Sequence, residues 1–395
     1  MIRHIIKSVW YRKKTNALIA SELFVAFLVL FGLLSTLIYF KVTFHRTLGF
    51  DYSDTWVVQI DRGGEWRPEM ASTIKQLILA CRGMDQVTAC EPLAMVPYGG
   101  STWTSTITTR TGERSAIHNS VGDGIADMMN IHLVSGRWFG PEDDRDDWTP
   151  VIINQRVAEA VFGDENPLGQ FLDHLDKEDE RKRTVVGVFD DFRQHGEFSA
   201  PTDVVFMRYP LLESSEGALR NFVVKIKPDT TAAFEPELVT QLQKFAPGWQ
   251  FFVEPLDQMR SEKHKEVLLP LSILGVVAGF LLLMVALGIL GVLWQNVTQR
   301  RQELGLKRAL GASKSDVRWQ IVLELMVLTG FAVIAGSFVA VQVPITGLFG
   351  FVDGFVFAWG LLAAATVLFL LTFLCTLYPS WLSTRIRPAE ALHYD

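Results

Sequence analysis

The sequence predicts a membrane protein with four transmembrane α-helices and a mixed α+β extracytoplasmic domain between the first and second spans. Three observations predict this fold class. Four segments are apolar over more than about 20 residues, the length that a helix needs to cross a hydrocarbon core of about 30 Å. Basic residues gather beside these segments, and a long acidic region separates the first two. With 49% hydrophobic and 20% charged residues, the chain does not have the composition of a disordered protein.

The four apolar segments are residues 17–40, 267–294, 319–343 and 355–379. The first contains one charged residue, Glu22, and the third contains Glu324. The first segment is too long for the apolar region of a signal peptide and lacks a small-residue cleavage site after it. We therefore expect it to remain as an uncleaved anchor.

Charge segregation along the chain sets the expected orientation. Residues 41–266 carry a net formal charge of −12, whereas the flanks 1–16, 295–318 and 380–395 together carry +9. Basic loops stay on the cytoplasmic side of a membrane. Both termini and the 295–318 loop are thus predicted to be cytoplasmic, and residues 41–266 and the 344–354 loop to lie on the outer side of the membrane. An acidic domain of this size also argues against a nucleic-acid partner.

Residues 1–16 have apolar side chains at helical spacing, namely Ile2, Ile5, Ile6, Val9 and Trp10, with basic residues between them. This pattern predicts an amphipathic helix in contact with the lipids of the inner leaflet. The alternative is a basic topology signal without helical structure.

The region between the first two spans divides into a domain, 41–255, and a stalk, 256–266, which has helical character and no helix breaker before span two. Runs rich in β-branched and aromatic residues predict strands at 55–60, 102–109, 150–154, 184–189, 204–208 and 221–226. Apolar periodicity predicts helices at 68–81, 155–162 and 233–245.

The domain shows no pattern typical of an enzyme or a metal site. Its histidines lack the spacing of a zinc motif, and the acidic residues at 142–147 do not follow the pattern of a calcium loop, so we expect a solvated loop there. Cys81 and Cys90 have two alternatives, a disulfide or two thiols, because the sequence does not fix their separation. A binding or force-transmitting module is the expected role.

The cytoplasmic segment 295–318 is short, basic and locally helical, and it is either a docking element for a cytosolic partner or a simple connector. Residues 301–313 read RQELGLKRALGAS, which resembles the R-x-E-[IL]-G-x-x-[KR]-A-[LI]-G-A segment of ABC permeases of the MacB/FtsX type. Further resemblances follow in order along the chain: SGRWF at 135–139, VFG at 161–163 with PLG at 167–169, VVGV at 185–188, Glu324, YPS at 378–380 and RPAEAL at 387–392.

This resemblance implies that residues 302–312 form a coupling helix seated on a separate cytosolic ABC ATPase. It also implies that the membrane is a bacterial inner membrane and that residues 41–266 are periplasmic. The residues implied to couple are Arg301, Glu303, Leu304, Gly305, Leu306, Lys307, Ala309, Leu310, Gly311 and Ala312. It also implies a second permease chain, either a copy in a homodimer or a paralogue in a heterodimer, and mechanical transmission from the ATPase to the outside domains. A periplasmic adaptor and an outer-membrane channel are further partners that the sequence leaves open.

No GxxxxGK[ST] loop occurs in the sequence, so we expect this chain to bind no cofactor and to have no catalytic or metal site of its own, with ATP and Mg held by the partner ATPase. Within the spans, Gly275 and Gly279 form a GxxxG pattern and are expected to pack on another span, within the chain or across a dimer. Glu22 and Glu324 are expected to pair with a basic residue such as Arg300 or Lys307 rather than to relay protons.

The predicted function is therefore that of a MacB-type permease subunit that drives export of an amphiphilic substrate such as an antimicrobial peptide or a drug. Three alternatives stay open: a lipoprotein-release permease, an FtsX-like regulator of a cell-envelope enzyme, and a receptor without an ATPase.

Overall fold

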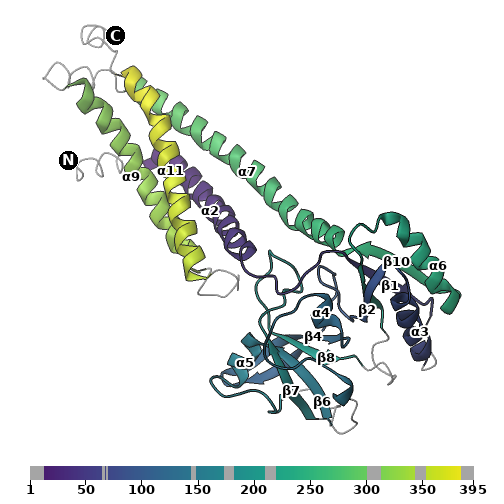
Figure 1. Cartoon of the computed structure of the whole chain (residues 1–395). Coiled ribbons are helices and arrows are strands. Elements are labelled where there is room, and N and C mark those ends of the chain that lie inside the picture. The colour runs from purple at the N-terminus through teal and green to yellow at the C-terminus, as the bar shows by residue number, and fades with distance from the viewer. Residues whose placement is uncertain are drawn as a thin grey trace. The chain divides into compact units, whose positions relative to one another are not determined.

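The structure is a computed structural model and describes residues 13–64, 67, 70–143, 148–172, 182–209, 219–299, 313–342 and 353–383 (Figure 1). The chain forms two compact units. We call Thr43–Val267 the α/β domain, and Met1–Val42 together with Leu268–Asp395 the membrane unit. Most of the predicted helix at residues 1–16 lies outside the described residues, which begin at Lys13.

The membrane unit is built from four helices that are long and apolar enough to cross a bilayer, as predicted. They are α2 (Lys13–Phe44), α7 (Leu256–Gln299), α9 (Lys314–Ala340) and α11 (Gly354–Ser383). Helix α2 extends beyond the predicted span to Phe44, and α9 ends at Ala340 rather than at residue 343. A capping box starts α9, because the Ser313 hydroxyl accepts from the Asp316 N–H and the Asp316 carboxylate accepts from the Ser313 N–H.

Close contacts between these helices occur where one side is a small residue. An added Cβ at Gly336 on α9 would meet the Phe27 ring of α2 at 2.3 Å, and one at Gly360 on α11 would meet the Ser35 hydroxyl at 2.0 Å. The Thr329 hydroxyl of α9 also hydrogen-bonds to that of Thr372 on α11 at 3.1 Å. Small residues allow such approach in lipid, where burial of apolar surface does not drive association.

Helix α7 joins the two units without interruption. It begins in the α/β domain at Leu256 and runs for 44 residues to Gln299, or about 66 Å at 1.5 Å per residue. Its first 11 residues are the predicted stalk, which continues into the second span as expected. Pro270 lies inside the helix and removes one backbone hydrogen bond just beyond the unit boundary.

A four-stranded antiparallel sheet forms one half of the α/β domain. Its strand order is β10 (Gln250–Pro255), β1 (Thr55–Asp61), β9 (Asn221–Ile226) and β2 (Val87–Pro92). Helices α3 (Met70–Arg82) and α6 (Glu235–Phe245) cover one face, and the short helix η2 (Ala232–Phe234) leads into α6. The apolar residues of both helices recur at helical spacing, so Ile74, Leu77, Ile78, Leu238 and Leu242 are buried against the sheet.

A six-stranded mixed sheet forms the other half. Its order is β3 (Thr104–Thr109), β4 (Gly112–Val121), β8 (Val204–Arg208), β6 (Trp148–Asn154), β7 (Lys182–Phe189) and β5 (Leu133–Gly136). Helix α5 (Gln155–Val161) packs on this sheet, and the Asn154 side chain caps its N-terminus by accepting from the Val157 N–H. The short helices α4 (Ile125–Met128) and η1 (Pro141–Asp143) lie in the connections.

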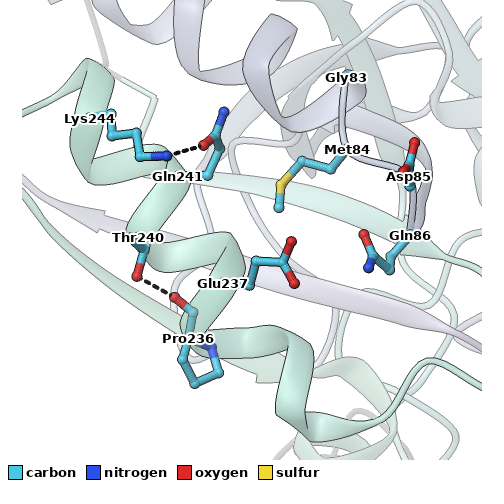
Figure 2. A pocket seen from close by; sticks show the side chains of 9 residues that line it. All are labelled: Gly83, Met84, Asp85, Gln86, Pro236, Glu237, Thr240, Gln241 and Lys244. Carbon is cyan, nitrogen blue, oxygen red and sulfur yellow. Dashed lines mark hydrogen bonds between the residues drawn. The ribbon is translucent and has the colours of Figure 1, made fainter.

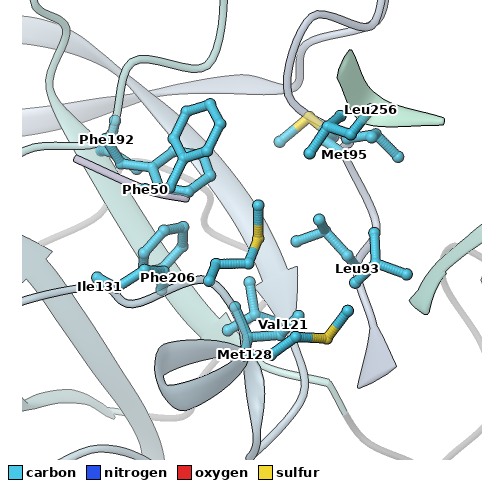
Figure 3. Close-up of a cluster of buried hydrophobic side chains, with 14 of the residues drawn as sticks. Phe50, Leu93, Met95, Val121, Met128, Ile131, Phe192, Phe206 and Leu256 are labelled. Atoms are coloured by element: carbon cyan, nitrogen blue, oxygen red, sulfur yellow. The ribbon is translucent and has the colours of Figure 1, made fainter. Parts of the chain in front are cut away.

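The largest apolar core of the α/β domain combines residues from both sheets with the start of α7 (Figure 3). Phe189, Phe192 and Phe206 form its aromatic centre, with ring centroids 4.7 Å apart for Phe189–Phe206 and 5.1 Å for Phe192–Phe206. Leu256 and Met259 of α7 are buried in the same core. The first turns of α7 are therefore anchored in the domain by apolar contacts.

The sequence motifs at 135–139 and 185–188 meet each other in the fold. Gly136 pairs with Gly187 across the antiparallel β5–β7 ladder. Gly136 has a φ of +78°, and an added Cβ there would lie 2.3 Å from the Val186 carbonyl oxygen. Only glycine fits that position without strain, because it combines a left-handed backbone with close approach of a neighbouring strand.

All six predicted strands and all three predicted helices of the domain are present; β8 and β9 have the predicted bounds, and the ends of the others are shifted. The sequence analysis missed β2, β4, β5 and β10. The prediction that the acidic residues at 142–147 form a solvated loop was wrong for Asp143. This residue is 4% exposed and accepts two hydrogen bonds from the Arg137 guanidinium, at 2.6 and 2.7 Å. Residues 144–147 of that loop lie outside the described residues.

Candidate coupling junction

The predicted coupling segment cannot be located, because Arg301, Glu303, Leu304, Gly305, Leu306, Lys307, Ala309, Leu310, Gly311 and Ala312 all lie outside the described residues. The proposed basic partners Arg300 and Lys307 do so as well. The two membrane carboxylates are described. Glu22 on α2 packs against Gly288 on α7, where an added Cβ would be 2.5 Å from its Oε2. Glu324 accepts a hydrogen bond from Gln320 Nε2 at 3.2 Å.

Gly275 and Gly279 make no close contact within the described part of this chain, since an added Cβ at either would meet no atom within 4 Å. Packing of this face against a second permease chain stays a prediction. The close glycine contacts of the membrane unit are instead at Gly288, Gly336 and Gly360.

The α/β domain contains a polar site that joins the ends of both chain segments leading to the membrane unit. Its centre is the loop of residues 190–203, between β7 and β8, which we call the junction loop. This loop contacts the last residues of α2 on one side and the first turns of α7 on the other, and all of these residues belong to the α/β domain. The junction is therefore a candidate for transmitting movement between α2, α7 and the two sheets.

Arg193 of the junction loop holds the end of α2. Its side chain is fully buried, and its Nη1 donates to the Thr43 carbonyl oxygen at 2.8 Å. Carbonyl groups in the last turn of a helix lack an intrahelical partner and carry partial negative charge, so a guanidinium caps them well. Nη2 donates to the carbonyl oxygens of Glu197, at 2.6 Å, and Ser199. One cation thus fixes both the helix end and the path of the loop.

Glu197 of the same loop holds the start of α7. One carboxylate oxygen accepts from Arg260 Nε at 2.5 Å, and the other is 3.0 Å from His264 Nε2. An ionised carboxylate only accepts, so His264 must carry its proton on Nε2 here. Arg260 and His264 are four residues apart and therefore project from the same face of α7.

Aromatic side chains surround these polar contacts. Phe44 at the end of α2, Phe198 of the junction loop and His264 of α7 form a group with ring centroids 5.0 to 6.1 Å apart. On the other side, the Arg260 guanidinium lies 4.7 Å from the centroid of the Tyr52 ring. A desolvated cation over an aromatic face contributes about 0.5–2 kcal/mol. The three segments therefore share both charged and apolar contacts.

Electrostatics favour the ionised form of this junction. Burial alone would raise the pKa of Glu197, but hydrogen bonds from His264 and Arg260 outweigh it, so its pKa lies below the ordinary value. Burial tends to lower the pKa of Arg260, and the Glu197 carboxylate reverses this and raises it. Burial and the adjacent Glu197 charge raise the pKa of Tyr98, whose hydroxyl lies 3.4 Å from both carboxylate oxygens. Glu197 is thus a carboxylate, and Tyr98 a neutral donor, at neutral pH.

The sequence analysis missed this junction because its contacts join residues that are 63 to 150 positions apart in the chain, and no single segment carries a motif. One signal was available. Arg260 and His264 sit at i and i+4 on the predicted stalk, which places two cationic or polar groups on one helix face and implies an acidic partner. The sequence does not say which of the domain's many carboxylates provides it.

The domain also has an open cavity of about 540 Å³ between α6 and the turn that follows α3 (Figure 2). Met84 and Glu237 face each other across it in Figure 2, and Lys244 donates to Gln241 at 2.9 Å on its wall. It does not include any residue of the junction.

Comparison with known proteins identifies the family. Residues 24–241 match the family model of the MacB-like periplasmic core domain, and residues 275–388 match that of the FtsX-like permease C-terminal region. The chain belongs to the MacB/FtsX-type ABC permeases. The two matches cover most of the α/β domain and most of the last three spans, in the order that the sequence motifs predict.

Several curated relatives resemble this permease. The macrolide export ATP-binding/permease protein MacB of Neisseria meningitidis is 24% identical over 56% of this chain, which spans about a third (34%) of that relative's length. The uncharacterized ABC transporter permease YknZ of Bacillus subtilis is 23% identical over 72% of this chain and 71% of its own. The probable syringafactin exporter SyfD of Pseudomonas syringae is 25% identical over 70% of this chain and 42% of its own.

Among solved structures, the periplasmic region of MacB from Actinobacillus actinomycetemcomitans covers 54% of this chain and 93% of its own. It has 16% sequence identity and a TM-score of 0.38.

Proposed function

We propose that this permease is the transmembrane subunit of a MacB-type ABC transporter that works with a cytosolic ATPase. ATP and Mg bind that partner, and residues 301–312 form the element that docks on it. The α/β domain lies outside the inner membrane, and both termini lie in the cytoplasm. A second permease chain completes the transporter.

The observation that carries this proposal is the junction. ATP-driven displacement of α2 against α7 in the membrane acts directly on the junction loop, because Arg193 holds Thr43 and Glu197 holds Arg260 and His264. The loop is continuous with β7 and β8, two strands of the six-stranded sheet. Rigid packing around Phe192 and Phe206 then transfers the displacement to the domain core.

The substrate class that we propose is an amphiphile that reaches the transporter from the outer face of the membrane. Two relatives support this class, since their names assign them to export of macrolides and of syringafactin. Release of lipoproteins and regulation of a cell-envelope enzyme share this architecture and are separated from export by an assay of the transported molecule.

Co-purification tests the role. The full chain is isolated from its native membrane in mild detergent, beside a variant with Glu303→Ala and Gly311→Ala and a control with Glu237→Gln on the exposed side of α6. We expect an ATPase with a Walker A motif to accompany the wild type and the control and to be lost with the double variant. Retention of the ATPase by the double variant would assign the contact to another part of the chain. Absence of any ATPase from all three samples would favour a receptor instead.

A further inference from the structure

The two cysteines of the α/β domain lie together in one apolar core. Cys81 is in the last turn of α3 and Cys90 is in β2, and both are fully buried. They belong to the same cluster of buried side chains between the four-stranded sheet and its covering helices. In the structure both are thiols.

Two charged side chains hold the segments that carry these cysteines side by side. Arg82, the residue after Cys81, donates from Nε to the Cys90 carbonyl oxygen at 2.9 Å. Its Nη2 forms an ion pair with Glu91, the residue after Cys90. These contacts clamp the end of α3 against β2 at the level of the two thiols.

The chain between the two cysteines is a compact turn. Met84 N–H donates to the Cys81 carbonyl oxygen at 3.2 Å, and Val87 N–H donates to the Met84 carbonyl oxygen at 3.0 Å. Residues 83–86 of this turn line the open cavity of Figure 2, so solvent reaches the turn but not the sulfur atoms. The connecting backbone is therefore short and internally hydrogen-bonded, and both cysteines belong to the core beside it.

The environment of the folded state suppresses thiolate chemistry. Burial, together with a hydrogen bond to the Cys81 thiol, raises the pKa of the Cys90 thiol well above its ordinary value. Because the thiolate is the reactive form, the folded and reduced domain exchanges slowly with external disulfides. Oxidation must therefore occur while the domain is folding.

We propose that Cys81 and Cys90 form a structural disulfide bond in the mature permease. The inference rests on the outward placement of the α/β domain in the proposed function, because disulfides persist in the oxidising cell envelope and not in the cytosol. The oxidant is an envelope protein with a reactive disulfide. One cysteine thiolate attacks that disulfide and releases one donor thiol, and the second cysteine then displaces the donor.

The bond formed is Sγ–Sγ between Cys81 and Cys90, and the bond broken is the donor's disulfide. The two electrons and two protons lost by the cysteines leave with the donor as its dithiol. The role of the bond is to fix α3 on β2.

Mass spectrometry of the wild-type chain tests the bond directly. Intact cells are quenched with acid, and the full chain is alkylated under denaturing conditions without reductant and digested with trypsin. Cleavage after Lys75, Arg82 and Arg110 separates the two cysteines onto peptides 76–82 and 83–110. We expect these peptides to be linked, two hydrogen atoms lighter than their sum, and alkylated only after reduction. Recovery of both peptides alkylated without reductant in most of the protein would overturn the proposal.

Thermal unfolding gives a second measurement. The chain has three cysteines, and the third, Cys375 on α11, lies in a membrane helix, so reductant acts on one bond only. We expect reductant to lower the Tm of the α/β domain by roughly 5 to 10 °C in the wild type. We expect reductant to leave the Tm of the Cys81→Ser/Cys90→Ser variant unchanged. An equal Tm with and without reductant in the wild type contradicts a structural bond.

A topology control separates failure of the disulfide from failure of the proposed function. Glu237→Cys, on exposed α6, is placed in a chain whose three natural cysteines are replaced by serine. A membrane-impermeant maleimide labels it in spheroplasts if the domain is outside. Labelling together with free Cys81 and Cys90 rejects the disulfide alone. Labelling only after permeabilisation rejects both proposals.

Discussion

Substituting Glu197 by glutamine removes the charge that binds the start of α7 to the junction loop while preserving the side-chain shape. The amide keeps one acceptor oxygen, so either Arg260 or His264 loses its partner. The substitution therefore weakens the contact with α7 and leaves the Arg193 contact with Thr43 in place. We expect local opening of the first turns of α7 rather than unfolding of the domain.

The structure sets the magnitude. Hydrogen bonds to charged groups contribute about 1.5–3 kcal/mol when buried, and exposed ion pairs about 0.2–1 kcal/mol. The Glu197 side chain is 8% exposed, and those of Arg260 and His264 are 26% and 19% exposed, so the junction lies between these limits. A loss of about 2 kcal/mol increases the population of the open junction roughly 30-fold.

Hydrogen exchange of the full chain in nanodiscs measures this opening. We expect amides of residues 256–266 to exchange roughly 30-fold faster in Glu197→Gln than in the wild type, with amides of α6 unchanged. Glu237→Gln serves as the control, because it removes the same charge from an exposed site on the same domain. Exchange of residues 256–266 within about twofold of the wild type would refute the assigned role of Glu197.

Three further perturbations have defined outcomes. Gly136→Ala forces a Cβ to within 2.3 Å of the Val186 carbonyl oxygen, so we expect the Tm of the domain to fall by roughly 6–12 °C. The control is Gly169→Ala, at a position with a similar φ of +80° and no atom within 4 Å of the added Cβ, and its Tm should fall by about a third as much. Equal falls in Tm for the two variants would exclude the steric explanation. The pKa of Glu197 is lowered in the folded chain, so the stabilisation that its carboxylate provides is fully present above the ordinary pKa of 4.5 and is lost as pH falls through the lower folded pKa. Exchange of residues 256–266 should then rise in that acid range for the wild type and not for Glu197→Gln. A rise of equal size in both would assign the acid response to another group. Pro270→Ala restores the helix hydrogen bond to the Glu266 carbonyl, which proline removes at a cost of about 3 kcal/mol; amides of residues 267–274 should exchange more slowly, and unchanged exchange would mean that α7 is already rigid there.

Local physics explains which parts of the fold were predictable from the sequence. The four spans are long uninterrupted apolar runs, so the length of each run predicts a membrane helix. Strands such as β1 and β9 are rich in β-branched residues, so their local composition predicts a strand. Strand β4 was missed because its sequence, GERSAIHNSV, begins with exposed polar residues and still contains polar residues, His118 and Asn119, where it is buried in the core. Strand β2 was missed because VTACEP is short and ends in proline, which is uncommon in strands. Its pairing with β9, which identifies it as a strand, is not visible in the sequence.

The candidate site divides in the same way. The coupling segment predicted at residues 301–312 rests on a contiguous motif, and it stays a prediction because those residues lie outside the described part of the chain. The junction depends on Thr43, Glu197 and His264, which only the folded chain brings together. A buried arginine in a loop, such as Arg193, has no local pattern that distinguishes it from an exposed one, since its partners are backbone carbonyl groups.

The most direct test of coupling through the junction compares nucleotide states of the assembled transporter. The permease with its ATPase is reconstituted in nanodiscs, and hydrogen exchange of β7, of β8 and of residues 190–203 between them is measured without nucleotide and with ATP and vanadate. We predict a nucleotide-dependent change in hydrogen exchange in the wild type. In Glu197→Gln this change is at least several-fold smaller, while the ATPase rate stays above about half of the wild-type rate. A change in exchange of the same size in the variant would contradict transmission through Glu197. A loss of ATPase rate as large as the loss of the exchange change would contradict it as well.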